Sequence, residues 1–430
     1  MSFFSSLFNS NNRPLHMGKY PMEAIKRVDK TTTLITDEVP RTPKRANFFI
    51  RLAFGDMGKR PAAEIKRFVG KYPLNRAMGK VMREHVPLGR GEPNEDVSPL
   101  PDDQTERANH LKSLCYFMDA DIVGICEVPD YAWYSHDVDG NEIPARHKYA
   151  IVMLIDQGYE TMAGSSGDDW ISASQSYRAY VNGSQTATVV TNYLLELGYE
   201  AQAHTNADSD VLHNPLVMLA GLGELSRIGE VVLNPFLGPR FKTSIVTTNL
   251  EMAVDKPIDF NLQEFCDSCK KCARECPSQA ISYGDKVMFN GYEMWKPDVE
   301  ACTKYRVMNP AGSGCGRCMK VCHFNKKGLL QHRLALWMAI NWSFTHKFLI
   351  WLDDALGYGE RAPIWKWWQD LEDVDGKFVR PKKTNERDLR PEKQAPDRQK
   401  NVTFYGLDTL PPLGSKEPHP LKKPRKKKKD

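Results

Sequence analysis

Apolar residues follow strand-like and helix-like patterns in the middle of the chain. Residues 148–155 form an almost unbroken apolar run (KYAIVMLI), which is typical of a strand covered on both faces. Residues 172–197 show apolar positions at helical spacing, and Gly198 is suited to end that helix. Shorter patterns predict strands at 122–126, 199–205 and 243–252, and a helix from residue 214 that breaks at a glycine pair. Because helices and strands alternate, we expect an α/β (α+β) core over residues 101–260.

The flanking regions are less regular. Residues 1–100 are rich in Pro, Lys and Arg, with short helical stretches between, which indicates an extended segment that wraps over the core. Residues 329–370 are rich in aromatic side chains, and the apolar stretch 329–352 predicts a buried or interfacial helix. That stretch contains four basic or histidine side chains and no run of about 18 apolar residues, so a membrane span is not expected. Membrane-surface contact remains a minor alternative. Residues 371–430 form a polar, basic tail, draped on the surface or disordered.

The charge lies mainly at one end of the chain. The net charge is +5, and the last ten residues contribute +6, which leaves −1 for the rest. A protein that follows nucleic acid would spread basic charge over its folded surface, so nucleic-acid binding is not expected. The N-terminus has neither a basic region before an apolar stretch nor a twin-arginine pair. We therefore expect a cytoplasmic protein.

Eight of the ten cysteines fall between residues 266 and 322, and they suggest iron–sulfur chemistry. The first four follow the C-x2-C-x2-C-x3-C-P pattern of bacterial ferredoxins, in which the fourth cysteine binds a second cluster. By the same rule, the last cysteine of the second group, Cys322, binds the first cluster. We thus expect a ferredoxin-like module with two [4Fe–4S] clusters over residues 261–328. One cluster would use Cys266, Cys269, Cys272 and Cys322, and the other Cys276, Cys302, Cys315 and Cys318.

Two other uses of these cysteines must be weighed. Zinc prefers paired C-x2-C knuckles and leaves the longer first run unexplained. Disulfides need an oxidising compartment, for which the N-terminus gives no sign. The remaining cysteines, Cys115 and Cys126, lie in helix and strand patterns and are expected in the core.

Longer stretches of the chain resemble a known family. Residues 220–282, from AGLGELSRIGE to CPSQAIS, are similar to the signature region of the corrinoid-dependent reductive dehalogenases. Residues 111–125, 193–206, the second cysteine group and residues 352–361 fit the same family in the same order. The resemblance covers about residues 100–362. Epoxyqueuosine reductases are relatives that share the plan of one corrinoid and two clusters.

The resemblance implies a nitroreductase-like core that binds base-off cobalamin. In such enzymes electrons pass through the clusters to Co(I), which removes halide from an organohalide. A small substrate, possibly aromatic, and an external low-potential donor such as ferredoxin or flavodoxin would be the partners. No DxHxxG cobalamin-ligand motif is present, which agrees with a corrinoid held without a protein histidine. Contacts to the corrinoid are expected from Gly221, Leu222, Gly223, Glu224 and His204.

The resemblance also implies the catalytic residues. Tyr180 is expected to donate a proton, with Tyr177 as its rival, and Arg240 to stabilise negative charge, with Lys242 as its rival. Asn206 would help to place the substrate. Each has a simpler structural explanation: a core tyrosine, a surface ion pair and a helix cap. The tryptophans could line a substrate pocket, although at helical spacing such residues are more often core. They are Trp337, Trp342, Trp351, Trp365, Trp367 and Trp368.

Some positions depart from the family pattern. Ser226 stands where glycine is usual, His323 follows Cys322 where proline is common, and the export signal of respiratory members is missing. These departures favour a cytoplasmic, possibly catabolic enzyme. The alternatives are an epoxyqueuosine-reductase-like enzyme, which would need a basic surface for RNA, and a non-catalytic iron–sulfur electron carrier.

Overall fold

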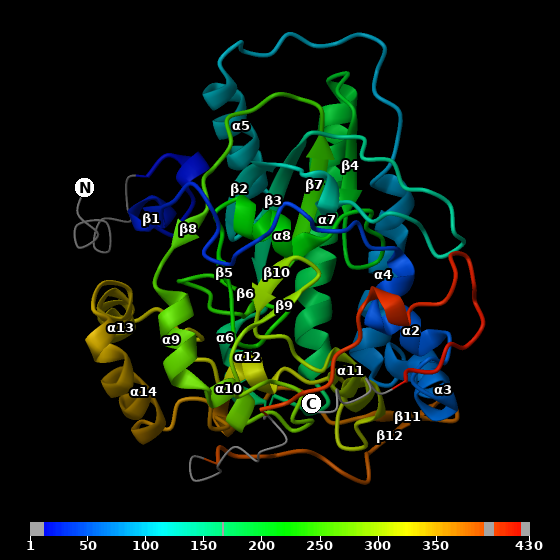
Figure 1. Cartoon of the computed structure of the whole chain (residues 1–430), viewed down its shortest axis with the longest axis vertical. Coiled ribbons are helices and arrows are strands. Elements are labelled where there is room, and N and C mark those ends of the chain that lie inside the picture. Colours follow the sequence, from blue (N-terminus) through cyan, green and yellow to red (C-terminus); the bar gives the residue numbers. More distant parts are fainter. Residues whose placement is uncertain (1–12, 166, 391–399, 423–430) are drawn as a thin grey trace, which may run out of the picture.

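A four-stranded antiparallel sheet forms the centre of the protein (Figure 1). The computed structural model describes residues 13–165, 167–390 and 400–422. The strand order is β2-β3-β7-β4, with β2 at Ile122–Glu127, β3 at Tyr149–Asp156, β7 at Phe241–Thr248 and β4 at Ala201–His204. All four strands were predicted from their apolar patterns. Their wholly antiparallel pairing was not, because pairing joins segments far apart in sequence.

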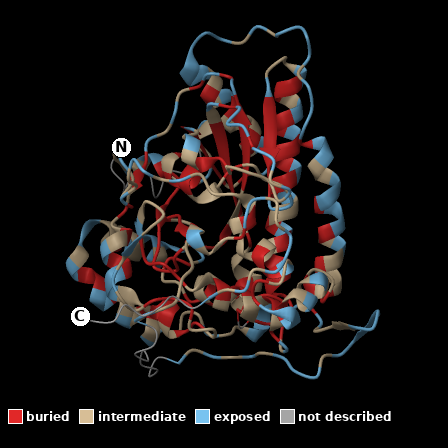
Figure 2. Cartoon of the chain, turned by 45° about the vertical axis from the view of Figure 1, so that its right-hand side comes forward, coloured by how far each residue is buried: buried red, intermediate tan, exposed pale blue. Residues whose placement is uncertain are grey.

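Alternating side chains of β3 pack into two different cores. Ile151, Met153 and Ile155 pack on the face covered by α5 (Gln104–Phe117) and α7 (Ser172–Glu196). Ala150, Val152 and Leu154 pack on the opposite face, against α8 (His213–Leu219). Both faces are therefore buried, as the apolar run predicted, and Figure 2 shows the strands almost wholly buried.

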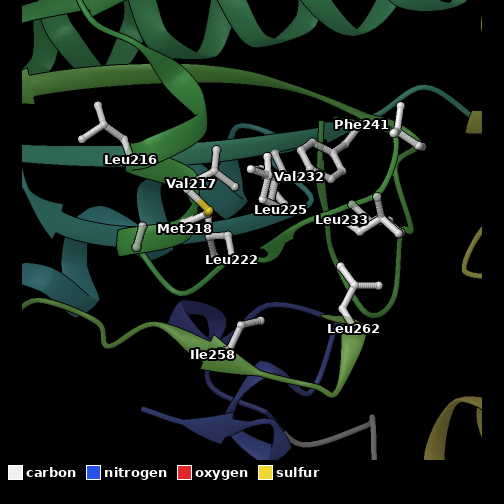
Figure 3. Packing of buried hydrophobic residues seen from close by; sticks show 14 of the residues in the cluster. Leu216, Val217, Met218, Leu222, Leu225, Val232, Leu233, Phe241, Ile258 and Leu262 are labelled. Carbon is white, nitrogen blue, oxygen red and sulfur yellow. The ribbon is translucent and has the colours of Figure 1, made fainter. Parts of the chain in front are cut away.

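The core on the α8 side continues beyond the sheet (Figure 3). Leu216, Val217 and Met218 of α8 pack with Leu225 of β5 (Glu224–Leu225) and Val232 of β6 (Val232–Leu233). This core also includes Cys266 and Cys272. The sheet and the cysteine region thus share one continuous core, which fixes one relative to the other.

The long helix α7 ends as predicted. Gly198 has φ +84°, and its N–H donates to the Leu195 carbonyl, which satisfies the last turn. Helix α4 (Pro73–Leu88) packs along α7. The segment 1–100, in which short helical stretches were expected, thus contains one helix of four turns. It also contains α2 (Phe48–Ala53), α3 (Lys59–Phe68) and β1 (Lys26–Arg27), which pairs with β8 (Ile258–Asp259).

Four short helices follow the sheet and lie below it in Figure 1. They are α9 (Leu262–Cys269), α10 (Lys271–Arg274), α11 (Val299–Met308) and α12 (Arg317–Lys320), with the hairpin β9 (Val287–Phe289) and β10 (Tyr292–Met294) between α10 and α11. Further short elements are α6 (Tyr159–Gly164) and the 3-10 helices η1 (Leu15–Met17), η2 (Met22–Ala24), η3 (Lys44–Ala46), η4 (Asp130–Ala132), η6 (Pro363–Trp365) and η8 (Leu407–Thr409).

The aromatic-rich region is a pair of helices rather than one. Helix α13 (Leu330–Asn341) ends at Trp342, and after η5 (Ser343–Thr345) the chain continues as α14 (His346–Ala355). No proline or glycine marks this break, so the sequence pattern missed it. Among the described residues, no helix is long and apolar enough to cross a bilayer.

The C-terminal region is draped over the protein. It includes the hairpin β11 (Glu372–Val374) and β12 (Lys377–Val379). Farther on, Leu421 packs with the α2–α3 core, and the His419 N–H donates to Asp56 at 2.9 Å. Most of the basic sequence at the very end, residues 423–430, lies outside the described residues.

Candidate functional site

Four cysteines line one small cavity. Three belong to the first group, and the fourth comes from much later in the sequence. Lys270 lies between α9 and α10 with φ +52°, a left-handed conformation that redirects the chain. Cys266 and Cys269 precede this turn and Cys272 follows it. Cys322 lines the same cavity. The structure thus brings together the four cysteines that the crossing rule assigned to one cluster.

The second group also gathers as predicted. Burial raises the pKa of the Cys318 thiol, and the nearby Cys315, Cys302 and Cys276 raise it further. They come from the loop after α10, from α11, from the loop before α12 and from α12 itself. Cys276 is held in part by the Ala280 N–H, which donates to its sulfur at 3.3 Å.

The environment of these thiols suits metal clusters. All ten cysteines are free. Burial, together with a smaller effect of a neighbouring cysteine, raises the pKa of Cys302 to about 11 and of Cys322 to about 12. Such buried thiols become thiolates when metal cations replace their protons. Two groups of four are therefore a fitting donor set for two cubane clusters.

The geometry gives no support to the two alternatives. None of the ten cysteines forms a disulfide. Within the part of the chain that the structure describes, no three His, Cys, Asp or Glu side chains are close enough to share a single metal ion. Zinc needs its ligands about 2.3 Å from one centre, whereas the sulfurs around a cubane are spread over a larger cage.

Buried polar groups hold the first cysteine group in place. Arg227, only 1% exposed, donates to the Cys266 carbonyl at 2.7 Å and to the Ser282 carbonyl at 3.1 Å. His323 places Nδ1 3.2 Å from the Cys269 sulfur, and its Nε2 lies 3.4 Å from Asp353. The Lys271 ammonium also contacts Asp353, at 2.6 Å. A buried network of charges therefore ties α14 to the first cysteine group.

Tyr180 and Lys242 meet where α7 crosses β7. A side chain at Gly183 would lie 2.1 Å from the Ser244 hydroxyl, so the glycine lets the helix approach the strand closely. One turn earlier on α7, the Tyr180 ring lies under the Lys242 ammonium, 5.3 Å from the ring centroid. Tyr180 is half-buried. The pair combines a phenol and a cation in contact, which is suited to proton donation beside developing negative charge.

Arg240 is engaged elsewhere. Its guanidinium donates to both carboxylate oxygens of Asp156, at 2.8 and 3.1 Å, and to Asn325 at 2.6 Å. It is 4% exposed. Arg240 therefore fixes the end of β3 to the loop after Cys322, and Lys242, its rival in the sequence interpretation, is the cation beside Tyr180.

Asn206 and His204 lie on or just after β4, with different surroundings. His204 is the last residue of β4 and pairs with Ile245 of β7, whereas Asn206 lies in the bend that follows the strand. Asn206 is exposed. His204 is fully buried, with Thr247 at 2.8 Å on Nε2 and the Asp210 N–H donating to Nδ1. The structure thus makes His204 a core residue with both ring nitrogens engaged.

The segment from Gly221 to Glu224 is enclosed by protein. A side chain at Gly221 would lie 2.1 Å from the Lys256 carbonyl, and one at Gly223 would lie 2.2 Å from the Leu233 carbonyl. Leu222 is 1% exposed, and Glu224 accepts from the Phe260 N–H at 2.7 Å. The two glycines permit close approach of protein backbone, at Lys256 before β8 and at Leu233 of β6. The expected contact of this segment with a corrinoid stays a prediction.

The tryptophans do not form a pocket wall. Trp342, Trp351, Trp365 and Trp367 are 40–65% exposed, and only Trp368 is buried. A separate cavity of about 560 Å³ lies between α13, α14 and the N-terminal segment, next to Phe265 and His323. Trp337 and the exposed tryptophans are absent from its lining, as are Tyr180 and Lys242.

Sequence reasoning ranked Arg240 above Lys242, although a signal for the opposite order was present. Side chains alternate along β7, so Lys242, Ser244 and Val246 share one face. Val246 packs in the core under α7. Parity along this strand would therefore have placed Lys242, rather than a residue before the strand, on the face that carries Tyr180.

Known proteins match both the cysteine region and the whole fold. A 4Fe-4S dicluster domain matches residues 265–326. A solved reductive dehalogenase, described as suggesting a mechanism for B12-dependent dehalogenation, is 48% identical with a TM-score of 0.93, and the match covers 97% of this chain and 61% of that one. The catabolic reductive dehalogenase NpRdhA, solved with 3-bromo-4-hydroxybenzoic acid, is also 48% identical, with a TM-score of 0.90 and coverage of 94% and 59%.

A curated relative, tetrachloroethene reductive dehalogenase of Sulfurospirillum multivorans, is 39% identical over 156 residues, which are 35% of this chain and 30% of the relative. The chain therefore spans about three fifths of the solved proteins and under a third of this relative.

Proposed function

We propose that the chain is a member of the reductive dehalogenase family and acts as a B12-dependent reductive dehalogenase. In this proposal, two electrons pass through two [4Fe–4S] clusters to a corrinoid, and an organohalide is reduced. The observation that carries the proposal is the combination of two four-cysteine groups with the Tyr180–Lys242 pair in one fold. The sheet with α7 and α8 would be the nitroreductase-like core.

Each four-cysteine group would hold one cluster. Cys266, Cys269, Cys272 and Cys322 would bind the first, and Cys276, Cys302, Cys315 and Cys318 the second. The close approach within each group supports this division. Burial of the sulfurs keeps water away from the clusters and so favours low reduction potentials.

The corrinoid would supply a strongly reducing and nucleophilic cobalt centre for cleavage of the carbon–halogen bond. We assign no contact residues to it, because the expected set from Gly221 to Glu224 and His204 is enclosed by protein. The chain's own contribution would be the positioning of the substrate and the delivery of a proton.

Tyr180 would donate that proton and Lys242 would stabilise the charge. Replacing bromine on an aromatic ring by hydrogen needs two electrons and one proton, and releases bromide. The Tyr180 hydroxyl would give its proton to the ring carbon that loses bromide. The Lys242 ammonium over the Tyr180 ring would stabilise the phenolate left behind and attract an anionic substrate. Asn206, exposed in the bend after β4, would orient the substrate.

A halogenated hydroxybenzoate is the proposed substrate class, because NpRdhA binds 3-bromo-4-hydroxybenzoic acid. The electrons would come from an external low-potential carrier such as ferredoxin or flavodoxin. We also propose a cytoplasmic location, where eight thiols remain reduced until they bind metal.

The test is anaerobic reconstitution with iron, sulfide and cobalamin, followed by metal analysis and a bromide assay with 3-bromo-4-hydroxybenzoate. We expect about eight iron and one cobalt per chain, and bromide release that requires both metals. The Cys276→Ala variant should retain about half of the iron, and Cys115→Ala, a buried cysteine outside both groups, should retain all of it. Full iron loading without cobalt or bromide release would contradict the proposal.

A further inference from the structure

A basic strip runs along the surface between β12 and residue 390, drawn as part of the orange trace at the lower edge of Figure 1. This strip, residues 377–390, contains six Lys or Arg and two acidic residues. Its cations are mostly exposed, namely Lys377, Arg380, Lys382, Lys383 and Arg390. The chain without its last ten residues has a net charge of −1, so this local excess of positive charge is not a property of the whole surface.

The strip is fixed to residues that lie beside the second cysteine group. Arg317, between Cys315 and Cys318, is fully buried and donates to the Arg387 carbonyl at 2.9 Å. Glu275, next to Cys276, accepts from the Arg390 N–H at 3.0 Å. Both anchors therefore belong to residues adjacent in sequence to cysteines of the second group.

Two more contacts hold the strip against the same region. The Trp170 indole donates to the Lys383 carbonyl at 3.2 Å, and Arg387 lies 3.6 Å from Asp168. Since these anchors use mainly backbone carbonyls and N–H groups, the side chains of Lys382 and Lys383 remain exposed to solvent. The strip thus presents positive charge at a fixed place near the second cluster site.

We propose that the basic strip is the docking surface for an acidic low-potential electron carrier of the ferredoxin or flavodoxin type. The carrier would deliver electrons to the cluster of Cys276, Cys302, Cys315 and Cys318. Encounters between redox proteins bury little surface and depend on complementary charge, which raises the association rate. A carrier bound on the strip would lie beside Arg317 and Glu275, the sequence neighbours of Cys318 and Cys276, and so close to the second cluster site. This inference rests on the proposed function.

The test compares two charge reversals of equal size in the reconstituted protein. Lys382→Glu with Lys383→Glu changes the strip, and Arg146→Glu with Lys148→Glu changes two exposed cations just before β3, outside the strip and outside both four-cysteine groups. Cluster reduction by a photochemically reduced acidic flavodoxin is followed by stopped-flow absorbance at about 0.01 M ionic strength, where charges act over about 30 Å.

We expect the strip variant to react with flavodoxin about ten-fold or more slowly than wild type, and the control to stay within about two-fold. The difference should disappear at about 1 M salt, where the Debye length is about 3 Å. Titanium(III) citrate, a small reductant that needs no docking surface, is used with each protein to normalise the rates. Equal effects of both double variants, or no effect of either, would overturn the docking surface.

The titanium arm separates this inference from the proposed function. If titanium(III) reduces the clusters and drives bromide release while the two double variants behave alike, only the docking surface fails. If titanium(III) produces no bromide in any variant, the proposed function fails. Iron content and the binding of anionic vesicles and of tRNA are measured in parallel. Charge-dependent binding of the strip to either of these, with none to flavodoxin, would also overturn the inference.

Discussion

At the scale of single residues, the contact between Tyr180 and Lys242 determines the proposed chemistry. Their separation of 5.3 Å from ammonium to ring centroid joins an acid and a cation across α7 and β7. We expect Tyr180→Phe to lower bromide release by about 10²–10⁴-fold, the usual contribution of a positioned proton donor. Iron and cobalt content should not change.

Tyr177 provides the matched control for this prediction. It lies one turn earlier on the same helix and is buried in a small cluster with Met82 and Ala173. Tyr177→Phe should keep nearly full turnover. A Tyr180→Phe protein as active as wild type, or an equal loss in both variants, would remove Tyr180 from the mechanism.

His213 makes stability depend on pH. Burial lowers its pKa from 6.5 to about 4. The unfolded chain therefore binds a proton between pH 6.5 and 4 that the folded chain excludes, and stability falls as pH drops through this range. Between pH 7 and 5.5 this histidine accounts for a loss of about 1 kcal/mol.

The check is urea unfolding of wild type and His213→Gln at both pH values. The variant should lose about 1 kcal/mol less than wild type on acidification. His213 contacts Thr243 at 2.6 Å and Ser209 at 3.2 Å, so the variant is also expected to be less stable at pH 7. An identical pH response in both proteins would show that His213 does not titrate in this way.

At the scale of elements, the hairpin of β5 and β6 shows why its glycines are needed. The Cβ atom of any side chain at Gly223 would lie 2.2 Å from the Leu233 carbonyl oxygen, which is too close for a residue other than glycine. Gly223→Ala is expected to lower the free energy of unfolding by about 1–3 kcal/mol, as overpacking commonly does. Cobalt bound per folded chain should not change.

Gly70→Ala is the matched control, since a side chain there would meet its nearest atom at an ordinary 3.4 Å. It should unfold at nearly the wild-type denaturant concentration. A Gly223→Ala protein of normal stability that has lost cobalt would restore the segment to the corrinoid site.

The elements differ in how far the sequence could predict them. The sequence of β3 is an apolar run, and that of α7 has apolar residues at helical spacing followed by Gly198. Both patterns are local, so both elements were predicted closely. The break at Trp342 depends on packing against α9 and has no local signal. Sheet order likewise depends on contacts between distant segments.

The candidate site shows the same difference. The cysteine groups were predictable because cluster ligands follow a fixed local spacing. The choice of Lys242 over Arg240 was not made from sequence, because it depends on Asp156, an acid at the end of a different strand that binds Arg240. The pattern from Gly221 to Glu224 does not decide between a corrinoid and neighbouring protein, because a glycine that admits a ligand and one that admits protein backbone look alike in sequence.

At the scale of the whole molecule, the two cysteine groups and Tyr180 belong to one continuously packed structure. The core on the α8 side runs without interruption from the sheet to Cys266, and α7 extends from the second cysteine group to the far end of the sheet. At the start of α7 the Ala173 N–H donates to the Ser313 carbonyl at 2.8 Å. A rigid connection of this kind would hold clusters, cobalt and Tyr180 at fixed separations.

The most direct measurement is a single turnover in D₂O, with the reconstituted protein reduced by titanium(III) and supplied with 3-bromo-4-hydroxybenzoate. The account predicts that every two electrons release one bromide and yield one 4-hydroxybenzoate with a single deuterium at the ring carbon that held bromine, observed by mass spectrometry. Reduction of the clusters and cobalt with no bromide released would contradict it.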